Sequence, residues 1–323
     1  MRDVSRNLVA LICISSLVAC GRSEHADNVA GSGDAPGGRP TIALIMKSLA
    51  NEFFVTMADG ARAHQAAHEE QYRLIVNGIK NEIDLAQQVA LIDQMIASRV
   101  DAIVIAPADS KAMVPALARA SEAGIVIVNI DNRLDGDILQ EYGLSVPFVG
   151  PDNFRGAEIV GRYLAAQLAE GQEVAILEGV PTAYNSQRRS AGFEKAMADG
   201  GLNVVARQSA QWDQTLAVTV LSGILVQHPG LSAVLCANDN MALGAVAAIT
   251  QAGKGGQVKV IGFDNISAVR NLIREGSILA TVDQHADLLA VYGIEYALEA
   301  LASGTAIADK STPVDLITAD NLD

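Results

Sequence analysis

The sequence predicts an α/β protein in which two doubly wound parallel-sheet lobes are joined by a hinge of several strands. Three observations lead to this expectation. From residue 41 onward, short apolar segments rich in β-branched residues alternate with amphipathic helical segments. The apolar segments show no polar–apolar alternation, which is typical of parallel strands covered by helices on both faces. The pattern also restarts near the middle of the chain, which favours two open sheets over one closed barrel.

Length and charge narrow the possible functions. With 323 residues, half of them hydrophobic, the chain is long enough for two domains with substantial cores. Its formal net charge of -14 opposes binding to phosphate backbones, which depends on Lys and Arg. Nucleic acid is therefore not an expected partner.

Residues 1–19 are expected to be a lipoprotein signal peptide. Two arginines precede a short apolar run, residues 8–14, that is too short to span a membrane as a helix. The following "LVAC", residues 17–20, resembles the bacterial lipobox, in which the cysteine is acylated. The alternative is an ordinary signal peptide cut near Ala19. We therefore expect Cys20 to anchor an exported, periplasmic protein to a membrane through a lipid.

Residues 20–40 are expected to form a flexible tether, because they are rich in Gly, Asp, Ser and Ala and have no apolar period. Cys13 would be removed with the signal peptide, which leaves Cys20 and Cys236. If Cys20 carries lipid, Cys236 has no partner and the mature chain has no internal disulfide.

The expected strands follow one another at regular intervals. Between them lie amphipathic helices, and in the clearest one Leu85, Val89, Ile92 and Ile96 form a single apolar stripe. The strands are predicted at residues 41–46, 72–77, 101–106, 125–130, 173–178, 203–208, 232–237, 259–263 and 278–282.

The segment "LSVPFVGPDNFRG", residues 144–156, interrupts the alternation with two prolines and is interpreted as a crossing between the lobes. The N-terminal lobe is expected to contain residues 41–151 and 285–314. The C-terminal lobe is expected to contain residues 152–284 and 315–323. Two open sheets joined in this way leave a cleft in which a ligand can bind.

Polar residues follow several expected strands. Ligands of open parallel sheets bind outside the carboxyl ends of the strands, so these residues are candidates for a binding site. Taken singly, Asn51, Asp131 and Asp264 could instead each cap the following helix. A whole set at one cleft favours a site, and its members are Lys47, Asn51, Asp131, Asn238, Asp239, Asp264 and Gln284.

Catalytic and metal motifs are absent or incomplete in the sequence. His64 and His68 have a zinc-like spacing, but Gln65 stands where a Glu would be expected and no third ligand is evident. The acidic loop beginning at residue 131 lacks calcium ligands, since Arg133 and Tyr142 occupy its third and twelfth positions. We expect no metal, no cofactor and no catalytic residue.

Four segments together resemble one family over residues 41–316. They are "SLANEFF" (48–54), "CANDNMALGA" (236–245), "VIGFDN" (260–265) and "ATVDQ" (280–284). The chain is similar to the periplasmic sugar-binding proteins of ABC importers, in particular the ribose-binding and allose-binding type within the type I periplasmic binding proteins.

The resemblance implies a set of ligand-binding residues. Aromatic side chains would pack on the apolar faces of a sugar ring, and polar ones would bind its hydroxyl rim. The implied aromatic residues are Phe53, Phe54 and Trp212, and the implied polar ones are Asn51, Asp131, Arg189, Asn238, Asp264 and Gln284.

Two positions depart from the ribose-binding type. Asn132 stands where those proteins have Arg directly after the first pocket aspartate, with Arg133 one position later. Lys47 stands where they have Ser, as in the allose-binding type. Both Lys47 and Asn132 are therefore expected to contact the ligand, and whether Arg133 replaces the missing Arg is open.

The expected pocket is electrically balanced. Asp131 and Asp264 contribute two negative charges, and Lys47 and Arg189 contribute two positive ones. A desolvated site requires such a balance, and a balanced site suits a neutral ligand.

The function expected from the resemblance is that of an extracytoplasmic substrate-binding lipoprotein. It would capture a neutral monosaccharide, an allose-like or ribose-like sugar, between two closing lobes and deliver it to an ABC permease. One alternative is a sugar or polyol sensor that presents its ligand to a chemoreceptor or sensor kinase. A hydrolase using Asp131 and Asp264 is less favoured, since no activated nucleophile is visible.

Overall fold

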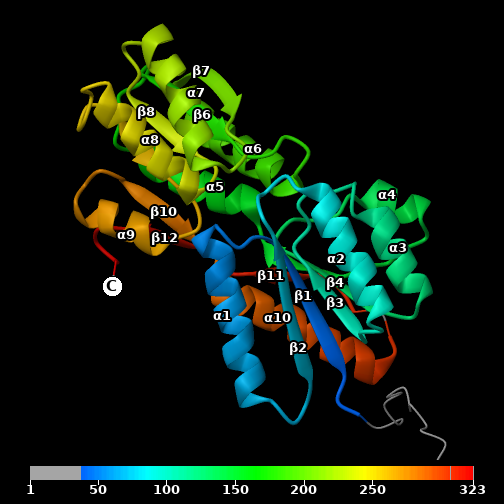
Figure 1. The fold of residues 1–323 in the computed structure, drawn as a ribbon. Coiled ribbons are helices and arrows are strands. Elements are labelled where there is room, and N and C mark those ends of the chain that lie inside the picture. Colours follow the sequence, from blue (N-terminus) through cyan, green and yellow to red (C-terminus); the bar gives the residue numbers. More distant parts are fainter. Residues whose placement is uncertain (1–37, 306, 323) are drawn as a thin grey trace, which may run out of the picture. The chain divides into compact units, whose positions relative to one another are not determined.

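Two parallel-dominated sheets form the frame of the protein in a computed structural model that describes residues 38–305 and 307–322 (Figure 1). The expected signal peptide and all but the end of the expected tether lie outside the described residues. Residues Arg39–Asp323 form one compact unit. In the described part of the chain, no helix is long and apolar enough to cross a membrane.

The first sheet has the strand order β2-β1-β3-β4-β5-β11, and every neighbouring pair is parallel. Its strands are β1 (Thr41–Ser48), β2 (Arg73–Ile79), β3 (Ala102–Ile105), β4 (Val126–Ile130), β5 (Phe148–Pro151) and β11 (Lys310–Thr312). The order reverses between β1 and β3, which is the point where doubly wound sheets bind ligands.

The second sheet repeats this order as β7-β6-β8-β9-β10-β12. Its strands are β6 (Glu173–Glu178), β7 (Asn203–Ser209), β8 (Ala233–Cys236), β9 (Lys259–Ile261), β10 (Ala280–Asp283) and β12 (Asp315–Thr318). Only β12 is antiparallel to its neighbour, β10, among the strands of this sheet that the structure describes.

Helices cover both faces of each sheet. On the first sheet, α1 (Glu52–Ala67) packs with α10 (Ala286–Ser303), while α2 (Leu85–Ala97), α3 (Val114–Glu122) and α4 (Gly136–Glu141) lie on the other side (Figure 1). On the second sheet, α5 (Asn153–Ala165) packs with α6 (Tyr184–Asp199), and α7 (Gln214–Gln227) packs with α8 (Asp239–Gln251), next to α9 (Ser267–Arg274).

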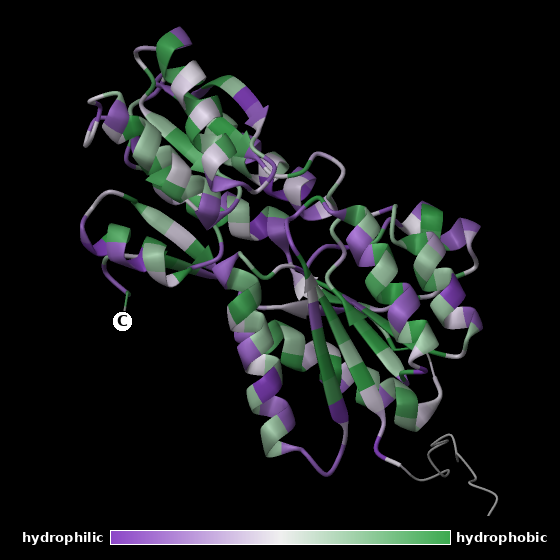
Figure 2. Cartoon of the chain, viewed as in Figure 1, coloured by the Kyte–Doolittle hydropathy of each residue, from purple (hydrophilic) through white to green (hydrophobic). Residues whose placement is uncertain are grey.

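The strand β1 shows why these strands are continuously apolar. Ile42 and Leu44 belong to the core cluster that contains residues of α1, whereas Ala43 and Ile45 belong to the cluster that contains residues of α2 and α3. Successive side chains of a strand point to opposite faces, so a sheet covered on both faces requires apolar residues at every position. Figure 2 shows hydrophobic residues along the strands and hydrophilic ones on the outer helix surfaces.

The predicted fold class is confirmed, with differences in detail. Strand β1 extends through Ser48, so Lys47 lies inside the strand and not beyond it. The segment 144–156 contains β5, which pairs with β4, before the chain enters α5 beside the second sheet. The short strands β5, β11 and β12 were not predicted. The chain therefore passes between the sheets after β5, after β10 and between β11 and β12.

Candidate functional site

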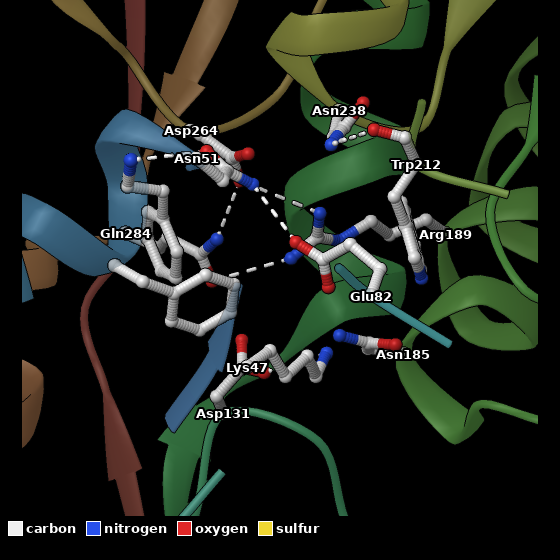
Figure 3. A pocket seen from close by; sticks show the side chains of 12 residues that line it. Lys47, Asn51, Glu82, Asp131, Asn185, Arg189, Trp212, Asn238, Asp264 and Gln284 are labelled. Atoms are coloured by element: carbon white, nitrogen blue, oxygen red, sulfur yellow. Dashed lines mark hydrogen bonds and ion pairs between the residues drawn. The ribbon is translucent and has the colours of Figure 1, made fainter. Parts of the chain in front are cut away.

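A pocket lies at the carboxyl ends of the strands, and residues that belong to both sheets and their helices line it (Figure 3). The space between the lining atoms, including the part open to solvent, is about 240 Å³. The lining residues are Lys47, Asn51, Phe53, Phe54, Glu82, Asp131, Asn185, Arg189, Trp212, Asn238, Asp264 and Gln284.

The structure brings together all of the sequence-predicted site residues except Asn132 and Asp239, whose carboxylate binds Thr281 and the Ile266 N–H instead. Two lining residues, Glu82 and Asn185, were not predicted. Glu82 follows β2 and Asn185 follows β6. Because ligands bind outside the carboxyl ends of parallel strands, the position of both residues in the sequence could have identified them as candidates.

Asn132 is a correction to the prediction. Its side-chain amide donates to the carbonyl of Pro107 at 3.0 Å, and its oxygen accepts from the backbone N–H of Asn185 at 3.1 Å. The side chain is fully buried and does not line the pocket. Arg133 does not take its place either, since its guanidinium pairs with Asp309 and lies over the Phe148 ring.

The end of β1 and the start of α1 supply one side of the pocket. The side chain of Asn51 caps α1, accepting a hydrogen bond from the backbone N–H of Phe53 at 3.0 Å. This cap places Phe53 and Phe54 in the first turn of the helix, with their ring centroids 5.1 Å apart in an edge-to-face contact. One residue thus acts both as helix cap and as pocket wall, and the same holds for Asn238, which caps α8 through Met241 N–H at 2.9 Å.

Lys47 and Asp131 form a buried ion pair. Lys47 Nζ lies 2.9 Å from Asp131 Oδ2, and both side chains are buried. The ammonium also lies 5.6 Å from the centroid of Phe54 and 5.8 Å from that of Trp212, within cation–π range. Asp131 has a positive φ of 60° and does not cap α4, whose cap is Asp135.

Arg189, Asp264 and Gln284 form a second polar group. Arg189 Nη2 donates to Gln284 Oε1 at 3.3 Å, and Gln284 Nε2 donates to Asp264 Oδ1 at 2.7 Å. Arg189 Nη1 reaches Asp264 Oδ1 at 3.5 Å and donates to the carbonyl of Ala237 at 2.8 Å. Its Nε donates to Asn153 Oδ1 at 2.7 Å, which fixes the guanidinium in the pocket.

Burial shifts the pKa values of these groups. Desolvation raises the pKa of Asp264 well above its ordinary value, against the opposing effect of the Arg189 charge. The same burial lowers the pKa of Arg189, although Asp264 and Asp131 favour its charged form. The neighbouring carboxylate of Asp239 is also buried, and it accepts hydrogen bonds from Thr281 Oγ1 at 2.7 Å and from the backbone N–H of Ile266 at 3.0 Å.

Trp212 contributes an aromatic surface from the second sheet, in the loop after β7. It adopts a positive φ of 66°, uncommon for a bulky residue, and its ring covers Gly179. A β-carbon at Gly179 would lie 2.1 Å from Trp212 Cζ2, so only glycine fits beneath the indole. Aromatic side chains thus reach the pocket from both lobes.

Three buried polar atoms of the pocket lack a hydrogen-bond partner in the described part of the chain. They are Asn185 Oδ1, Trp212 Nε1 and, apart from its ion pair, Asp131 Oδ2. Buried polar groups are normally hydrogen-bonded. These atoms are therefore available to a ligand with hydroxyl groups.

Glu82 changes the charge of the pocket. The sequence predicted two carboxylates and two cations, but the structure places Glu82 beside them as a third carboxyl group. The predicted balance is therefore wrong for fully ionised groups. Burial raises the pKa of Glu82 to about 7, with the Lys47 charge acting in the opposite direction.

Two helices beside the second sheet receive hydrogen bonds from residues beside the first sheet. Helices α6 and α9 lack a capping bond from their own N-cap side chains. Ser110 Oγ accepts from the Tyr184 N–H at 2.9 Å, and Glu52 Oε1 accepts from the Ser267 N–H at 2.8 Å. Two helices beside the second sheet are therefore capped by side chains of segments that belong to the first sheet.

Comparison with known proteins places this fold and pocket in a family. A sequence profile described as periplasmic binding protein domain matches residues 42–306. The chain is 50% identical to the D-ribose/D-allose-binding protein of Pseudomonas aeruginosa, over 98% of this chain and 99% of that protein.

Solved structures agree with the sequence comparison. An ABC transporter solute-binding protein from Burkholderia multivorans superposes with a TM-score of 0.86 at 53% identity, covering 87% of this chain and 100% of that one. One from Actinobacillus succinogenes with bound D-allose gives a TM-score of 0.82 at 36% identity, covering 87% and 98%. The chain therefore belongs to the periplasmic binding protein family.

Proposed function

We propose that this protein is an extracytoplasmic solute-binding protein that captures a neutral monosaccharide and delivers it to an ABC permease. The observation that carries the proposal is the pocket itself, which is lined by aromatic rings and by charged and amide side chains from both lobes. The names of the Pseudomonas relative and of the D-allose complex support a sugar as ligand. The family name supports residence in the periplasm.

The chemistry of the pocket matches that of a sugar. A pyranose ring has apolar C–H faces that pack against aromatic rings, and a rim of hydroxyls that both donate and accept. Asp131 and Asp264 are acceptors, and Arg189 and Lys47 are donors. A ligand without matching hydroxyls would leave these buried groups unpaired, which is the basis of selection.

Lys47 favours an allose-like hexose over ribose. Its ammonium reaches from β1 into the pocket, where serine would leave a gap and remove the cation paired with Asp131. Asn132 contributes to this preference only indirectly, through its hydrogen bond to the backbone of Asn185.

The lobes are proposed to close on the ligand. Lys47, Asn51 and Asp131 belong to the first lobe, and Arg189 and Asp264 belong to the second, so one ligand contacts both. Small-angle scattering should give a smaller radius of gyration at saturating sugar than without it. An unchanged radius would count against closure.

A transport role is favoured over an enzymatic one. Asp131 and Asp264, which a hydrolase would use, are each paired with a buried cation. The relatives reported above are named as binding proteins. No reaction product is therefore expected when the protein is incubated with the sugar it binds.

Membrane attachment through Cys20 completes the proposal. Acylation of this cysteine within "LVAC" would hold the protein at a membrane, with residues 20–40 as tether. Cell fractionation of Cys20→Ser against the wild type tests this step. The variant should move to the soluble fraction, and equal membrane association of both proteins would contradict it.

The binding proposal is tested by the emission of Trp212, the only tryptophan of the chain. Its emission should shift with D-allose, less readily with D-ribose, and stay unchanged with amino acids and carboxylates. Replacing Asp264 with Ala should remove the response, since Arg189 and Gln284 lose a partner, a loss of about 2–5 kcal/mol. The exposed Asp320→Ala is the matched control. Saturable binding of an amino acid would overturn the proposal.

A further inference from the structure

Glu82 lies in the loop between β2 and α2 and lines the same pocket. Its Oε1 accepts a hydrogen bond from Asn51 Nδ2 at 3.2 Å (Figure 3). In the described part of the chain, its other oxygen has no hydrogen-bond partner and the carboxyl group is in no ion pair. Glu82 is thus held in place by a neutral amide and keeps one oxygen available.

The cations of the pocket are already paired. Lys47 lies 2.9 Å from Asp131, and Arg189 lies 3.5 Å from Asp264. If Glu82 were ionised, the lining residues would carry three carboxylates and two cations. Glu82 is partly buried, and an ionised carboxylate there would have no paired cation, a cost that either a proton or a positive ligand would remove.

Glu82 lies between the pocket and a second, larger cavity. Together with Asn51 and Trp212, it lines both of them. A ligand held by the aromatic rings and by Arg189 would present one edge to Glu82. A hydroxyl at that edge would satisfy the free oxygen, and a ligand without it would leave the carboxyl group unpaired.

We propose that Glu82 is a specificity-determining residue of this pocket, which contacts a neutral ligand through a protonated carboxyl group that donates to a ligand hydroxyl. The inference rests on the proposed function, because it assumes a neutral sugar. It adds a contact that couples binding to the uptake of a proton.

The surroundings of Glu82 support this protonation state. Burial raises its pKa to about 7, and the nearby negative charge of Asp131 acts in the same direction. The hydrogen bond from Asn51 and the charges of Lys47 and Arg189 act against it. On the outer side, the charged residues that line the second cavity with Glu82 are Lys80 and Asp213.

The sign of the pH effect follows from these directions. In a form open to water, Glu82 would titrate near its ordinary value of 4.5, and in the pocket near 7. Binding then takes up a proton between these values, so the affinity falls as the pH rises from about 4.5 to about 7 and levels off above. The slope approaches about tenfold per pH unit for one proton.

The test uses the full chain, D-allose as probe and isothermal calorimetry from pH 5 to pH 8 in buffers of different ionisation enthalpy. Glu82→Gln keeps an acceptor for Asn51 and presents a permanent donor, so it imitates the protonated group. This variant should bind with less proton uptake than the wild type, and at least about tenfold more tightly at pH 8. Glu122→Gln on the exposed end of α3 is the control.

The difference between wild type and Glu82→Gln isolates this residue, because Asp239 and Asp264, whose pKa values are also raised, remain in both proteins. Equal proton uptake and equal pH profiles would overturn the inference while leaving the proposed function intact. Failure of the wild type to bind any sugar would overturn both.

An amino sugar distinguishes the other way of balancing the charge. If Glu82 is ionised in the complex, the 2-amino-2-deoxy analogue of the probe should bind the wild type more tightly than the parent sugar. Its advantage should then disappear in Glu82→Gln. That result would overturn the protonated form, whereas preference for the neutral sugar in both proteins supports it.

Discussion

Lys47 Nζ and Asp131 Oδ2 lie 2.9 Å apart in an ion pair whose two side chains are almost completely buried. The lysine comes from strand β1, next to the edge strand β2, and the aspartate follows β4, two strands away from β1 in the sheet. The pair therefore spans the point where the strand order reverses, and both of its residues line the pocket.

Breaking this pair should be costly. Lys47→Ser leaves Asp131 buried without its cation, and the free energy of unfolding should fall by about 3–5 kcal/mol. Chemical denaturation of Lys47→Ser, Asp131→Asn and the double variant measures the coupling. The double variant should recover part of the loss, and simple additivity of the single effects would contradict the pairing. In binding assays, Lys47→Ser should also shift the ratio of affinities towards ribose.

Gly179→Ala should disturb the pocket without touching a polar group. The added β-carbon would meet the indole of Trp212 at 2.1 Å, so the ring must move. We expect a loss of stability of roughly 1–3 kcal/mol and weaker sugar binding. Thermal unfolding and tryptophan emission report the two effects.

Gly223→Ala provides the control for this substitution. An added β-carbon at Gly223, inside α7, meets no atom within 4 Å. Alanine should stabilise the helix by about 0.5–1 kcal/mol and leave binding unchanged. Unchanged binding by Gly179→Ala as well would show that the position of Trp212 does not matter for the ligand.

The hydrogen bond from the Tyr184 N–H to Ser110 Oγ should contribute to closure. Ser110→Ala removes a cap from α6 that is supplied by the opposite lobe, a loss of about 0.5–2 kcal/mol. If the contact forms only when the lobes close, this loss should lower sugar affinity and leave the ligand-free stability unchanged. Ser98→Ala, at the exposed end of α2, is the control. A loss in ligand-free stability with unchanged affinity would show that the contact persists without ligand.

Asp239 should make the stability dependent on pH. Burial raises its pKa to about 7, whereas its ordinary value is 3.8. The folded protein therefore binds more protons than the unfolded chain between these values, so stability should decrease as the pH rises from about 4 to about 7 and then level off. Thermal unfolding at half-unit intervals measures the slope. Asp239→Asn should make it shallower, and an unchanged slope would assign the effect to other groups, such as Asp264.

The alternation of apolar strands and amphipathic helices was sufficient to predict the fold class. Burial on both faces requires apolar residues throughout the middle of β1, residues 42–46, and this pattern can be recognised in the sequence without knowing which elements the strand packs against. The strands β5, β11 and β12 have only three or four residues each. Pairs such as β11 with β5 join residues far apart in the chain, and such pairing leaves little local pattern.

The sequence alone placed the polar residues at the carboxyl ends of the strands, because that placement follows from the topology of a parallel sheet. Only the tertiary structure decided which of them face the pocket. Asn132 follows Asp131 directly, yet the positive φ of Asp131 and the hydrogen bonds to Pro107 and Asn185 direct the Asn132 amide away from it.

The net charge of the pocket could not be predicted from the sequence either. Counting residues in the expected pocket gave equal numbers of positive and negative groups, because Glu82 was one polar residue among several in its loop. Packing brings that loop against Asn51 and places a third carboxyl group in the pocket. Burial, which exists only in the folded chain, then determines the pKa of Glu82. Local sequence specifies which groups are present, whereas tertiary packing decides which are desolvated and therefore which carry charge.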